Sequence, residues 1–266
     1  MIEHEHIAVE RDGHVTTVII DRPEAKNACT GDMWVTLGEM FRHISYSGAR
    51  VAVLTGRGED FCAGADLSGG GLGDGTAAGS MDASHLAAMR LLGEAMTAIY
   101  HCQIPVIAKV DGVCIGAGFG LALAADMLWC SDRARFSAIF AKRGLSLDFG
   151  TSWLLRQRIG VHRAKELAFT AEMMDAARAK EVGFVNAVVP AAELDAAVAD
   201  IAGKVAGGPP IAISMTKRQL DNSGSSSLLQ SLEVEALAQN VNLSTNDMRE
   251  AFVAYFERRP PNFTGT

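Results

Sequence analysis

The chain has 266 residues, of which 48% are hydrophobic and 21% charged, and its formal net charge at pH 7 is −7. This composition is ordinary for a globular protein with a sizeable core, and the length fits one large domain or two small ones. The negative charge and the lack of a Lys/Arg run exclude a general nucleic-acid binder. A small anionic ligand remains compatible with the sequence, because a few positive groups can gather on an acidic protein.

The cysteines predict buried, reduced thiols rather than disulfides or metal ligands. There are five of them, no two form a C-x-x-C pair, and four lie in apolar surroundings. The first ten residues are polar and lack the apolar core of a signal peptide. The longest apolar run, 113–130, contains Asp126 and several glycines, so we do not expect it to span a membrane. We therefore expect a cytoplasmic protein with no membrane partner. We also expect no metal site, because no histidine has metal-ligand spacing to a Cys, Asp or Glu.

Residues up to about 137 alternate between strand-like and helix-like patterns. The strand-like segments are 6–12 and 14–21, which suggest a hairpin around Asp12-Gly13, then 49–56, 105–110 and 127–137, the last read as one strand and a turn. The helix-like segments are a helix capped by Thr30 or Asp32, one over about 84–101 and one that begins after residue 116. Residues 68–80 hold six glycines and predict a mobile loop.

From residue 141 onward the pattern is mainly helical, with one short β-like segment at 185–190. The helical segments are one that starts at 150–152, then 161–170, 175–182, 191–206, 210–222, 227–243 and 246–257. Strand–turn–helix repeats thus continue to about residue 190, and helices dominate after it. We predict one α/β core over 1–190 with a helical extension over 191–266, rather than two independent domains.

The segment 105–125 gives the first indication of chemistry. A strand-like run over 105–110 ends in a turn and the glycine cluster Gly116-Ala117-Gly118, after which an Ala/Leu-rich helix begins. Such a turn leaves backbone N–H groups unpaired at the positive end of a helix dipole, where they bind a phosphate or stabilise an oxyanion. The spacing argues against a dinucleotide site, because Gly116, Gly118 and Gly120 give G-x-G-x-G where the fingerprint requires G-x-G-x-x-G.

Four other short motifs stand in order with this cluster: R-P-E-A-K-N-A at 22–28, C-A-G-A-D-L at 62–67, K-R-G-L at 142–145 and F-E-R-R-P-P-N-F at 256–263. In this order and spacing the five motifs resemble the crotonase (enoyl-CoA hydratase/isomerase) superfamily over essentially the whole chain. The resemblance implies an α/β fold, a spiral of ββα repeats with a helical C-terminal trimerisation region. It also implies an acyl-CoA thioester as the substrate, no separate cofactor, and a homotrimer or hexamer.

The resemblance further implies that two backbone amides hold the thioester oxygen while negative charge develops on it. By motif match they belong to Ala65 and Ala117, and one such donor is typically worth about 3–4 kcal/mol in catalysis. Arg22 and Lys26 are candidates for binding the phosphates of coenzyme A. The predicted contacts of coenzyme A and the acyl chain are Lys26, Ala63, Ala65, Asp66, Leu67, Gly116 and Phe140.

The two glutamates of a typical hydratase in the family are missing, because the matching positions here are Gly120 and Phe140. Syn addition of water needs one group that activates the water and one that protonates the α-carbon. One carboxylate remains at a family position, Asp148, where isomerising members carry an acid. A single base can remove a proton from C2 of a 3-enoyl thioester and return it at C4. We therefore predict an enoyl-CoA isomerase with Asp148 as the acid/base.

Several alternatives stay open at this point. Asp148 also has the position of an N-cap for the helix that starts near Gly150, or of a nucleophile on an aryl-CoA ring. The chain is alternatively an enoyl-CoA hydratase of fatty-acid β-oxidation that works with a displaced carboxylate or a water network. A third hypothesis is a non-catalytic acyl-CoA-binding protein that has kept only the pair of amides.

Overall fold

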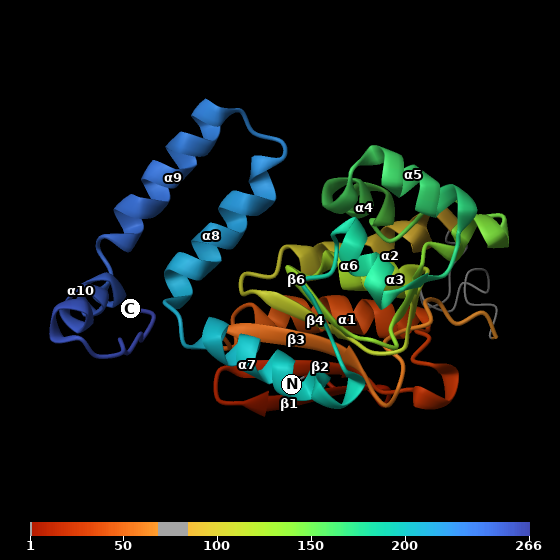
Figure 1. Cartoon of the computed structure of the whole chain (residues 1–266), viewed down its shortest axis with the longest axis horizontal. Helices are drawn as coiled ribbons and strands as arrows, with labels where there is room; N and C mark the ends of the chain where they lie inside the picture. Colours follow the sequence, from red (N-terminus) through yellow and green to blue (C-terminus); the bar gives the residue numbers. More distant parts are fainter. Residues whose placement is uncertain (1, 69–84) are drawn as a thin grey trace.

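The computed structural model of the chain describes residues 2–68 and 85–266 (Figure 1). It consists of a layered α/β body and a group of C-terminal helices that extend away from this body, on the left of Figure 1. The segment 68–80, for which the sequence predicts a mobile loop, lies outside the described residues except for Ser68.

A six-stranded sheet forms the centre of the body, with the strand order β1-β2-β3-β4-β6-β9. Its strands are β1 (Ile7–Asp12), β2 (Val15–Ile20), β3 (Val51–Gly56), β4 (Val106–Val110), β6 (Met127–Ser131) and β9 (Ala187–Val189). The first two strands form the antiparallel hairpin that the sequence predicts, with Ile7 opposite Ile20. The other neighbouring pairs are parallel, so each connection between them crosses over and carries helices.

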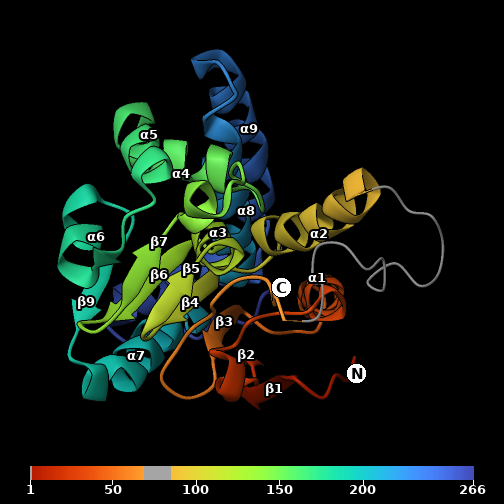
Figure 2. The same cartoon turned by 90° about the vertical axis from the view of Figure 1, so that its right-hand side faces the viewer.

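Helices cover both faces of this sheet (Figure 2). Those of the body are α1 (Gly31–Ile44), α2 (His85–Tyr100), α3 (Ala117–Ala124), α4 (Thr151–Ile159), α5 (Val161–Thr170), α6 (Ala176–Val182) and α7 (Leu194–Ala206), with short 3-10 helices η1 (Pro23–Ala25), η3 (Ile139–Arg143) and η4 (Ala191–Glu193). The predicted α/β architecture, with helices packed on a largely parallel sheet, is confirmed by this arrangement.

The continuous apolar run of β3 is explained by the burial of both its faces. Val51 and Val53 pack with the buried residues of α7, whereas Ala52 and Leu54 belong to the main core on the other side, with α1 and α3. Because alternate residues of a strand point to opposite faces, a strand buried on both sides needs an unbroken apolar sequence. The first long helix after residue 190 therefore completes the body.

A second, three-stranded sheet contains β5 (Val113–Ile115), β7 (Arg135–Ser137) and β8 (Met174–Asp175) in the order β5-β7-β8. The sequence predicts one strand and a turn over 127–137, but the structure has two strands there, β6 and β7, that belong to different sheets. It also has a strand at 113–115, where the sequence predicts a turn. Strands of two or three residues are too short to show a period of two. The equally short β9 is predicted, because it lies in the apolar segment 185–190.

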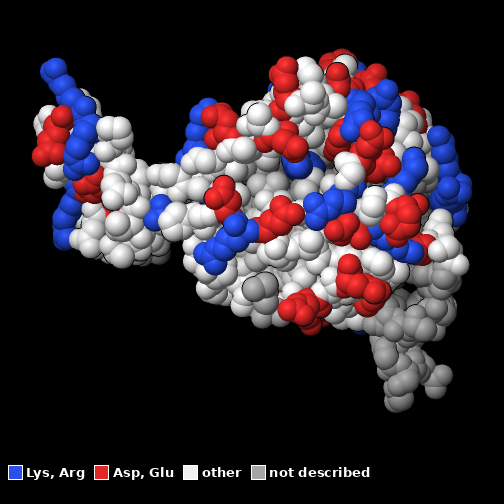
Figure 3. Space-filling view, turned by 90° about the horizontal axis from the view of Figure 1, so that it is seen from below, with Lys and Arg blue, Asp and Glu red and all other residues white. Residues whose placement is uncertain are grey.

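Three C-terminal helices, α8 (Pro210–Ser223), α9 (Leu228–Asn242) and α10 (Asn246–Glu257), project from the body and end in a lobe joined to it by a narrow connection (Figure 3). Buried Lys217 fastens α8 to the body, because its Nζ donates to Asp126 Oδ2 at 2.8 Å and to the Ile104 carbonyl at 3.3 Å. Large apolar side chains of the other two helices are exposed: Leu228, Leu229, Leu232, Leu237, Val241, Phe252, Tyr255 and Phe256.

Four further features of the structure bear on the composition of the chain: its cysteines, its membrane-spanning potential, its metal-ligating side chains and its surface charge. All five cysteines are free and buried, as their apolar surroundings predict. Within residues 2–68 and 85–266, no helix is both long and apolar enough to cross a membrane, and no three His, Cys, Asp or Glu side chains gather closely enough to hold a metal ion. On the face of the body seen in Figure 3, acidic and basic side chains are intermingled.

Candidate active site

The two glycine turns, which are about fifty residues apart in the sequence, lie against each other in the structure. Cys62 and Cys114 form a parallel β-bridge, and the Ile115 N–H donates to the Cys62 carbonyl at 3.1 Å. A Cβ on Gly118 would stand 2.3 Å from that same carbonyl oxygen, closer than any real contact. Glycine is therefore required at 118 for the start of α3 to approach the 62–67 segment.

Ala65 and Ala117 present unpaired amides at this junction. Cys29 forms a parallel β-bridge with Ala65: the Cys29 N–H donates to the Gly64 carbonyl at 2.8 Å, and the Cys29 carbonyl accepts from the Asp66 N–H at 2.9 Å. In a parallel bridge this pattern turns the N–H of the bridged residue away from its partner. Ala117 is the first residue of α3, where amides have no partner within the helix. Within the described part of the chain, neither amide has a hydrogen-bond acceptor.

The two amides belong to adjoining pieces of backbone. A Cβ placed on Gly64 would lie 3.4 Å from the Ala117 nitrogen. Gly116 adopts φ 58° and ψ −128°, a conformation that favours glycine, and its own N–H donates to the Ser137 carbonyl at 3.0 Å. Because α3 is buried along its whole length, its dipole acts at this point with little screening by water. The junction thus has the donors and the field that an oxyanion needs.

The other predicted coenzyme A contacts adjoin Ala65. The Ala63 N–H donates to the Lys26 carbonyl at 3.0 Å, which joins the 22–28 loop to the 62–67 segment. The Lys26 side chain is 62% exposed, and its Nζ lies 3.8 Å from Asp60 Oδ2. Leu67 is exposed as well. A cationic and an apolar side chain are therefore accessible next to the unpaired amides.

Asp66 and Arg22 are engaged with each other. Arg22 Nη1 donates to Asp66 Oδ2 at 2.6 Å, and it also donates to the Ala28 carbonyl at 3.1 Å. Ser68 donates to Asp66 Oδ1 through its N–H at 2.8 Å and its hydroxyl at 2.7 Å. These Ser68 hydrogen bonds, together with the one from Arg22, lower the pKa of Asp66 to about 2. Arg22 therefore ties the two loops together, and it is not free in the way expected of a phosphate-binding group.

Asp148 lies in the turn that precedes α4, and its Oδ1 is buried without a hydrogen-bond partner among residues 2–68 and 85–266. Burial raises the pKa of this carboxyl from 3.8 to about 6. The alternative that Asp148 is a helix cap is wrong: the N-cap of α4 is Gly150, and no side chain caps this helix end. A carboxyl with such a pKa is poised to exchange protons near neutral pH.

The two positions of the missing glutamates differ from each other in surroundings. Gly120 is buried on α3, and a Cβ there would lie 2.7 Å from the Phe149 carbonyl and 2.8 Å from Thr151 Oγ1. Phe140 is 5% exposed and belongs to the main core. The backbone and side chains that follow Asp148 therefore fill the place where a side chain at 120 would begin.

Thr151 is a polar group of this region that sequence reasoning missed. Its side chain is fully buried, and among the described residues its hydroxyl has no hydrogen-bond partner. In the sequence it reads only as a residue of the G-T-S helix start, a pattern too common to indicate chemistry. The one available signal is its spacing of three residues from Asp148, which a turn brings into proximity.

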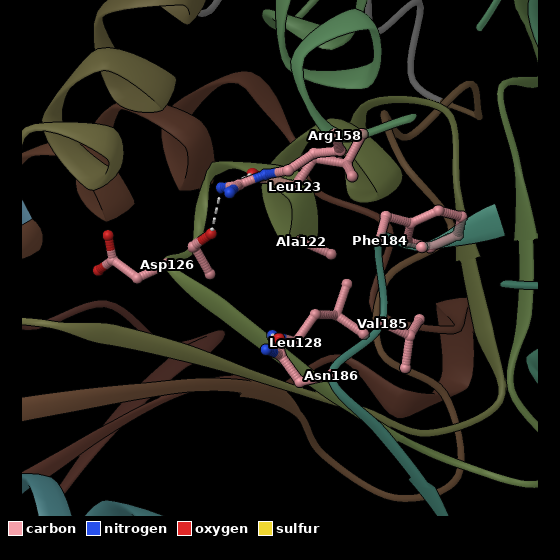
Figure 4. Close-up of a pocket in the computed structure, with 10 residues that line it drawn as sticks. Ala122, Leu123, Asp126, Leu128, Arg158, Phe184, Val185 and Asn186 are labelled. Atoms are coloured by element: carbon pink, nitrogen blue, oxygen red, sulfur yellow. Dashed lines mark hydrogen bonds between the residues drawn. The ribbon is translucent and has the colours of Figure 1, made fainter. Parts of the chain in front are cut away.

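A separate cavity of about 130 Å³ lies at the other end of α3 (Figure 4). Arg158 reaches across it from α4 and donates to the Ala125 carbonyl at 3.0 Å and the Leu123 carbonyl at 3.3 Å, at the negative end of the helix dipole. Its described lining includes none of the residues predicted for the acyl-CoA site. Arg158 thereby holds α4 against α3, the two helices whose first turns carry Thr151 and Ala117.

Comparisons with known proteins agree with the geometry. The family model described as "Enoyl-CoA hydratase/isomerase" matches residues 10–266. The chain is 35% identical over 255 residues to a "Probable enoyl-CoA hydratase" of Rhodobacter capsulatus, covering 94% of this chain and 95% of that protein. It is 32% identical over 266 residues to the peroxisomal "Delta(3,5)-Delta(2,4)-dienoyl-CoA isomerase" of Arabidopsis thaliana, covering 97% and 96% of the two chains.

A solved structure extends the agreement to the whole fold. The crystal structure of an enoyl-CoA hydratase from Bacillus anthracis superposes with a TM-score of 0.91 at 30% identity, covering 98% of this chain and 100% of that one. Hydratases and isomerases thus stand among the relatives at similar identity, which leaves the reaction type open. The chain belongs to the enoyl-CoA hydratase/isomerase (crotonase) family of acyl-CoA enzymes.

Proposed function

We propose that this enzyme moves the double bond of an enoyl-CoA from the 3 to the 2 position, through an enolate, with Asp148 as the proton carrier. The observation that carries the proposal is the half-buried Asp148 carboxyl, whose Oδ1 is buried without a hydrogen-bond partner among the described residues and whose pKa is raised by burial to about 6. The amides of Ala65 and Ala117 serve as the oxyanion hole, and the contacts predicted for coenzyme A are Lys26, Ala63, Asp66, Leu67 and Gly116.

The reaction needs one base and one pair of donors. The Asp148 carboxylate removes a proton from C2 of the 3-enoyl thioester, and the electron pair moves onto the thioester oxygen. The two amides hold this developing oxyanion, a type of interaction typically worth about 3–4 kcal/mol per donor. The protonated Asp148 then returns the proton at C4, the double bond forms between C2 and C3, and the carboxylate is regenerated.

The absence of acidic side chains at positions 120 and 140 favours this one-base scheme over the two-glutamate hydration of the family. Gly120 supplies no side chain, and Phe140 supplies only apolar surface. A base that removes a proton and later returns the same proton requires no second acid. The pKa of Asp148 suits both halves of the cycle, because a group near neutrality accepts and donates protons with similar ease.

The test compares 3-enoyl-CoA and 2-enoyl-CoA as substrates for the wild type, Asp148→Asn and the control Asp200→Asn, an exposed carboxylate paired with Lys204 on α7. We expect Asp148→Asn to lower kcat/KM for 3-to-2 conversion by about 10²–10⁴-fold, and the control to leave it unchanged. Conversion that persists in Asp148→Asn contradicts the proposal. Micromolar binding of both thioesters without turnover by the wild type supports the binding-protein alternative instead.

We also propose that the chain works as a homo-oligomer, a trimer or a hexamer, assembled through α9 and α10. The proposal is supported by the large exposed apolar side chains of these helices, such as Leu229 at 78% and Phe256 at 77% exposure. Light scattering after gel filtration tests it: Leu229→Glu together with Leu232→Glu should reduce the mass to that of a monomer. The control Tyr46→Glu, an exposed aromatic on the body, should not.

A further inference from the structure

The turn that carries Asp148 contains a strained residue. The turn runs from Asp148 to Thr151 and is closed by a hydrogen bond of 2.9 Å from the Thr151 N–H to the Asp148 carbonyl. Both central residues have a positive φ, 48° at Phe149 and 72° at Gly150, as in a type I′ turn. Glycine, asparagine and aspartate dominate such positions, and for a bulky side chain the left-handed region is a genuine outlier. Phe149 thus adopts a backbone conformation that phenylalanine disfavours.

Three helices hold this turn in its strained conformation. The Phe149 side chain is buried, and its ring centroid lies 4.6 Å from that of Trp34, a fully buried residue of α1. A Cβ on Gly150 would lie 2.4 Å from Met96 Cε, so this side chain of α2 rests directly on the glycine. The Phe149 carbonyl lies 2.7 Å from the Cβ position of Gly120 on α3. A strained conformation persists only where its surroundings enforce it, and α1, α2 and α3 do so here.

The Asp148 carboxyl depends on this support for its orientation. Its Oδ1 is buried, and within residues 2–68 and 85–266 no hydrogen bond holds that oxygen. Reacting groups are normally kept in place by packing and by hydrogen bonds from neighbouring side chains, and a displacement of about 1 Å can cost about 10²-fold in rate. With no hydrogen bond to hold Oδ1, the direction of the carboxyl is set by the backbone of the turn and by the packing of Phe149.

We propose that Phe149 and Trp34 are positioning residues of the reaction: their ring contact fixes the left-handed turn to α1 and thereby aims the Asp148 carboxyl at the substrate. The inference rests on the proposed role of Asp148 as the proton carrier. A glycine at 149 would adopt the same backbone angles without strain, but it would leave the turn without its anchor on α1. The strain at Phe149 is therefore the consequence of fixing the turn through a side chain.

The experiment measures kcat, KM and the pH dependence of kcat/KM for isomerisation of 3-enoyl-CoA by the wild type, Phe149→Leu and Phe149→Gly. Leucine keeps an apolar side chain but loses the ring contact, whereas glycine also relieves the strain of the positive φ. The matched control is Phe41→Leu, the same change at a fully buried ring of α1, roughly 10 Å along the helix from Trp34. Thermal melting of each variant shows that it folds and how much stability it loses.

We expect both changes at 149 to lower kcat about 10–100-fold and to leave KM within about twofold of the wild type. The acid limb of the pH profile should move from about 6 toward 3.8, because a carboxyl on a loosened turn reaches water and its pKa loses the effect of burial. Phe41→Leu should lose stability but keep the wild-type kcat and acid limb. A folded Phe149→Leu or Phe149→Gly with the kcat and acid limb of the wild type overturns the inference.

Trp34→Phe decides the matter if the variants at 149 do not fold. The smaller ring reduces the contact from the side of α1, so kcat should fall severalfold at an unchanged KM, and a wild-type kcat would overturn the inference. An inactive Asp148→Asn together with fully active variants at 149 refutes the positioning role alone and leaves the isomerase proposal intact. Isomerisation that survives Asp148→Asn is a different outcome, because it removes the base on which both proposals rest.

Discussion

The two halves of the proposed site are built in different ways. The oxyanion half consists of backbone: Cys29, Cys62 and Ile115 make the hydrogen bonds that hold together the two segments carrying the unpaired amides. The acid/base half consists of side chains, Asp148 and Thr151, whose oxygens have no partner among the described residues. One half is thus fixed by main-chain hydrogen bonds, whereas the side-chain oxygens of the other half have no partner in the described part of the chain.

This difference separates what the family shares from what each member does. A backbone donor needs no particular side chain, so the pair of amides survives Ala at 117 as long as the glycines around it allow the close approach. In the proposed function, the reaction depends on the acidic side chain that faces the substrate.

The largest effect should come from Gly118→Ala, which breaks the backbone half. The new Cβ would meet the Cys62 carbonyl at 2.3 Å, so α3 must move away from the 62–67 segment and carry the Ala117 amide with it. We expect activity with 3-enoyl-CoA to fall about 10²–10³-fold, the cost of losing one oxyanion donor. We also expect the free energy of unfolding to fall by roughly 1–3 kcal/mol.

The control for this variant is Gly203→Ala in α7, where an added Cβ meets no heavy atom within 4 Å. It should keep full activity and raise stability by roughly 0.5–1 kcal/mol, because alanine favours the helix. Chemical denaturation and steady-state kinetics measure both effects. Full activity of Gly118→Ala would show that the amide positions do not depend on this contact.

Gly120→Ala tests the border between the two halves. Its Cβ would press on the Phe149 carbonyl at 2.7 Å and on Thr151 Oγ1 at 2.8 Å, and the carbonyl belongs to the main chain and cannot rotate aside. We expect a loss of roughly 1–3 kcal/mol in stability by denaturation relative to Gly203→Ala. For the same reason Gly120→Glu combined with Phe140→Glu should not create a working two-glutamate hydratase. A stable, fully active Gly120→Ala would mean that α4 is free to move away from α3.

The pH dependence of the isomerisation rate tests the role of the Asp148 carboxyl without involving the backbone amides. Burial raises the pKa of Asp148 to about 6, and only the ionised form accepts a proton from C2. We expect kcat/KM for isomerisation to rise with pH through about 6 and then to level, so that the rate at pH 5 is about tenfold below the plateau. A profile whose acid limb breaks near pH 4 would assign the proton transfer to an unperturbed carboxyl.

The parts that sequence reasoning predicted are those with a long or specific pattern. The hairpin and the C-terminal helices follow from periodicity, and the buried strand β3 follows from its unbroken apolar run. The glycines at 64, 116 and 118 mark positions where a Cβ or an ordinary backbone conformation is not permitted. The short strands β5, β7 and β8 were missed because two or three residues carry no period. Their role is structural, since β5 leads directly into the Ala117 turn.

The burial and hydrogen-bond partners of individual side chains could not be predicted from the sequence. Nothing in the letters distinguishes a capping Asp148 from a buried, unpartnered one, because the outcome depends on how α3 and α4 pack. The same holds for Thr151, whose hydroxyl gains meaning only beside Gly120, thirty-one residues away in the chain. Arg22 is the opposite case: it reads as a free cation, but the fold pairs it with Asp66.

The smallest expected effect is a gain in stability from Asp148→Asn, and it distinguishes a catalytic carboxyl from a structural one. The native pKa of Asp148, about 6, exceeds the ordinary value of 3.8. Between these two pH values the folded protein therefore binds more protons than the unfolded chain, and its stability falls as pH rises. The penalty is complete above about pH 6, and below about pH 4 it vanishes.

Asparagine removes this penalty, so the melting temperature of Asp148→Asn should exceed that of the wild type by about 2–4 °C at pH 8, which corresponds to roughly 1 kcal/mol. The difference should disappear at pH 4. Asp66→Asn is the control of opposite sign, because Ser68 and Arg22 hold the pKa of Asp66 at about 2, and its removal should lower the melting temperature at pH 8. If Asp148→Asn melts lower than the wild type at pH 8, the fold stabilises the ionised carboxylate, and Asp148 is a structural group rather than the unpartnered base proposed here.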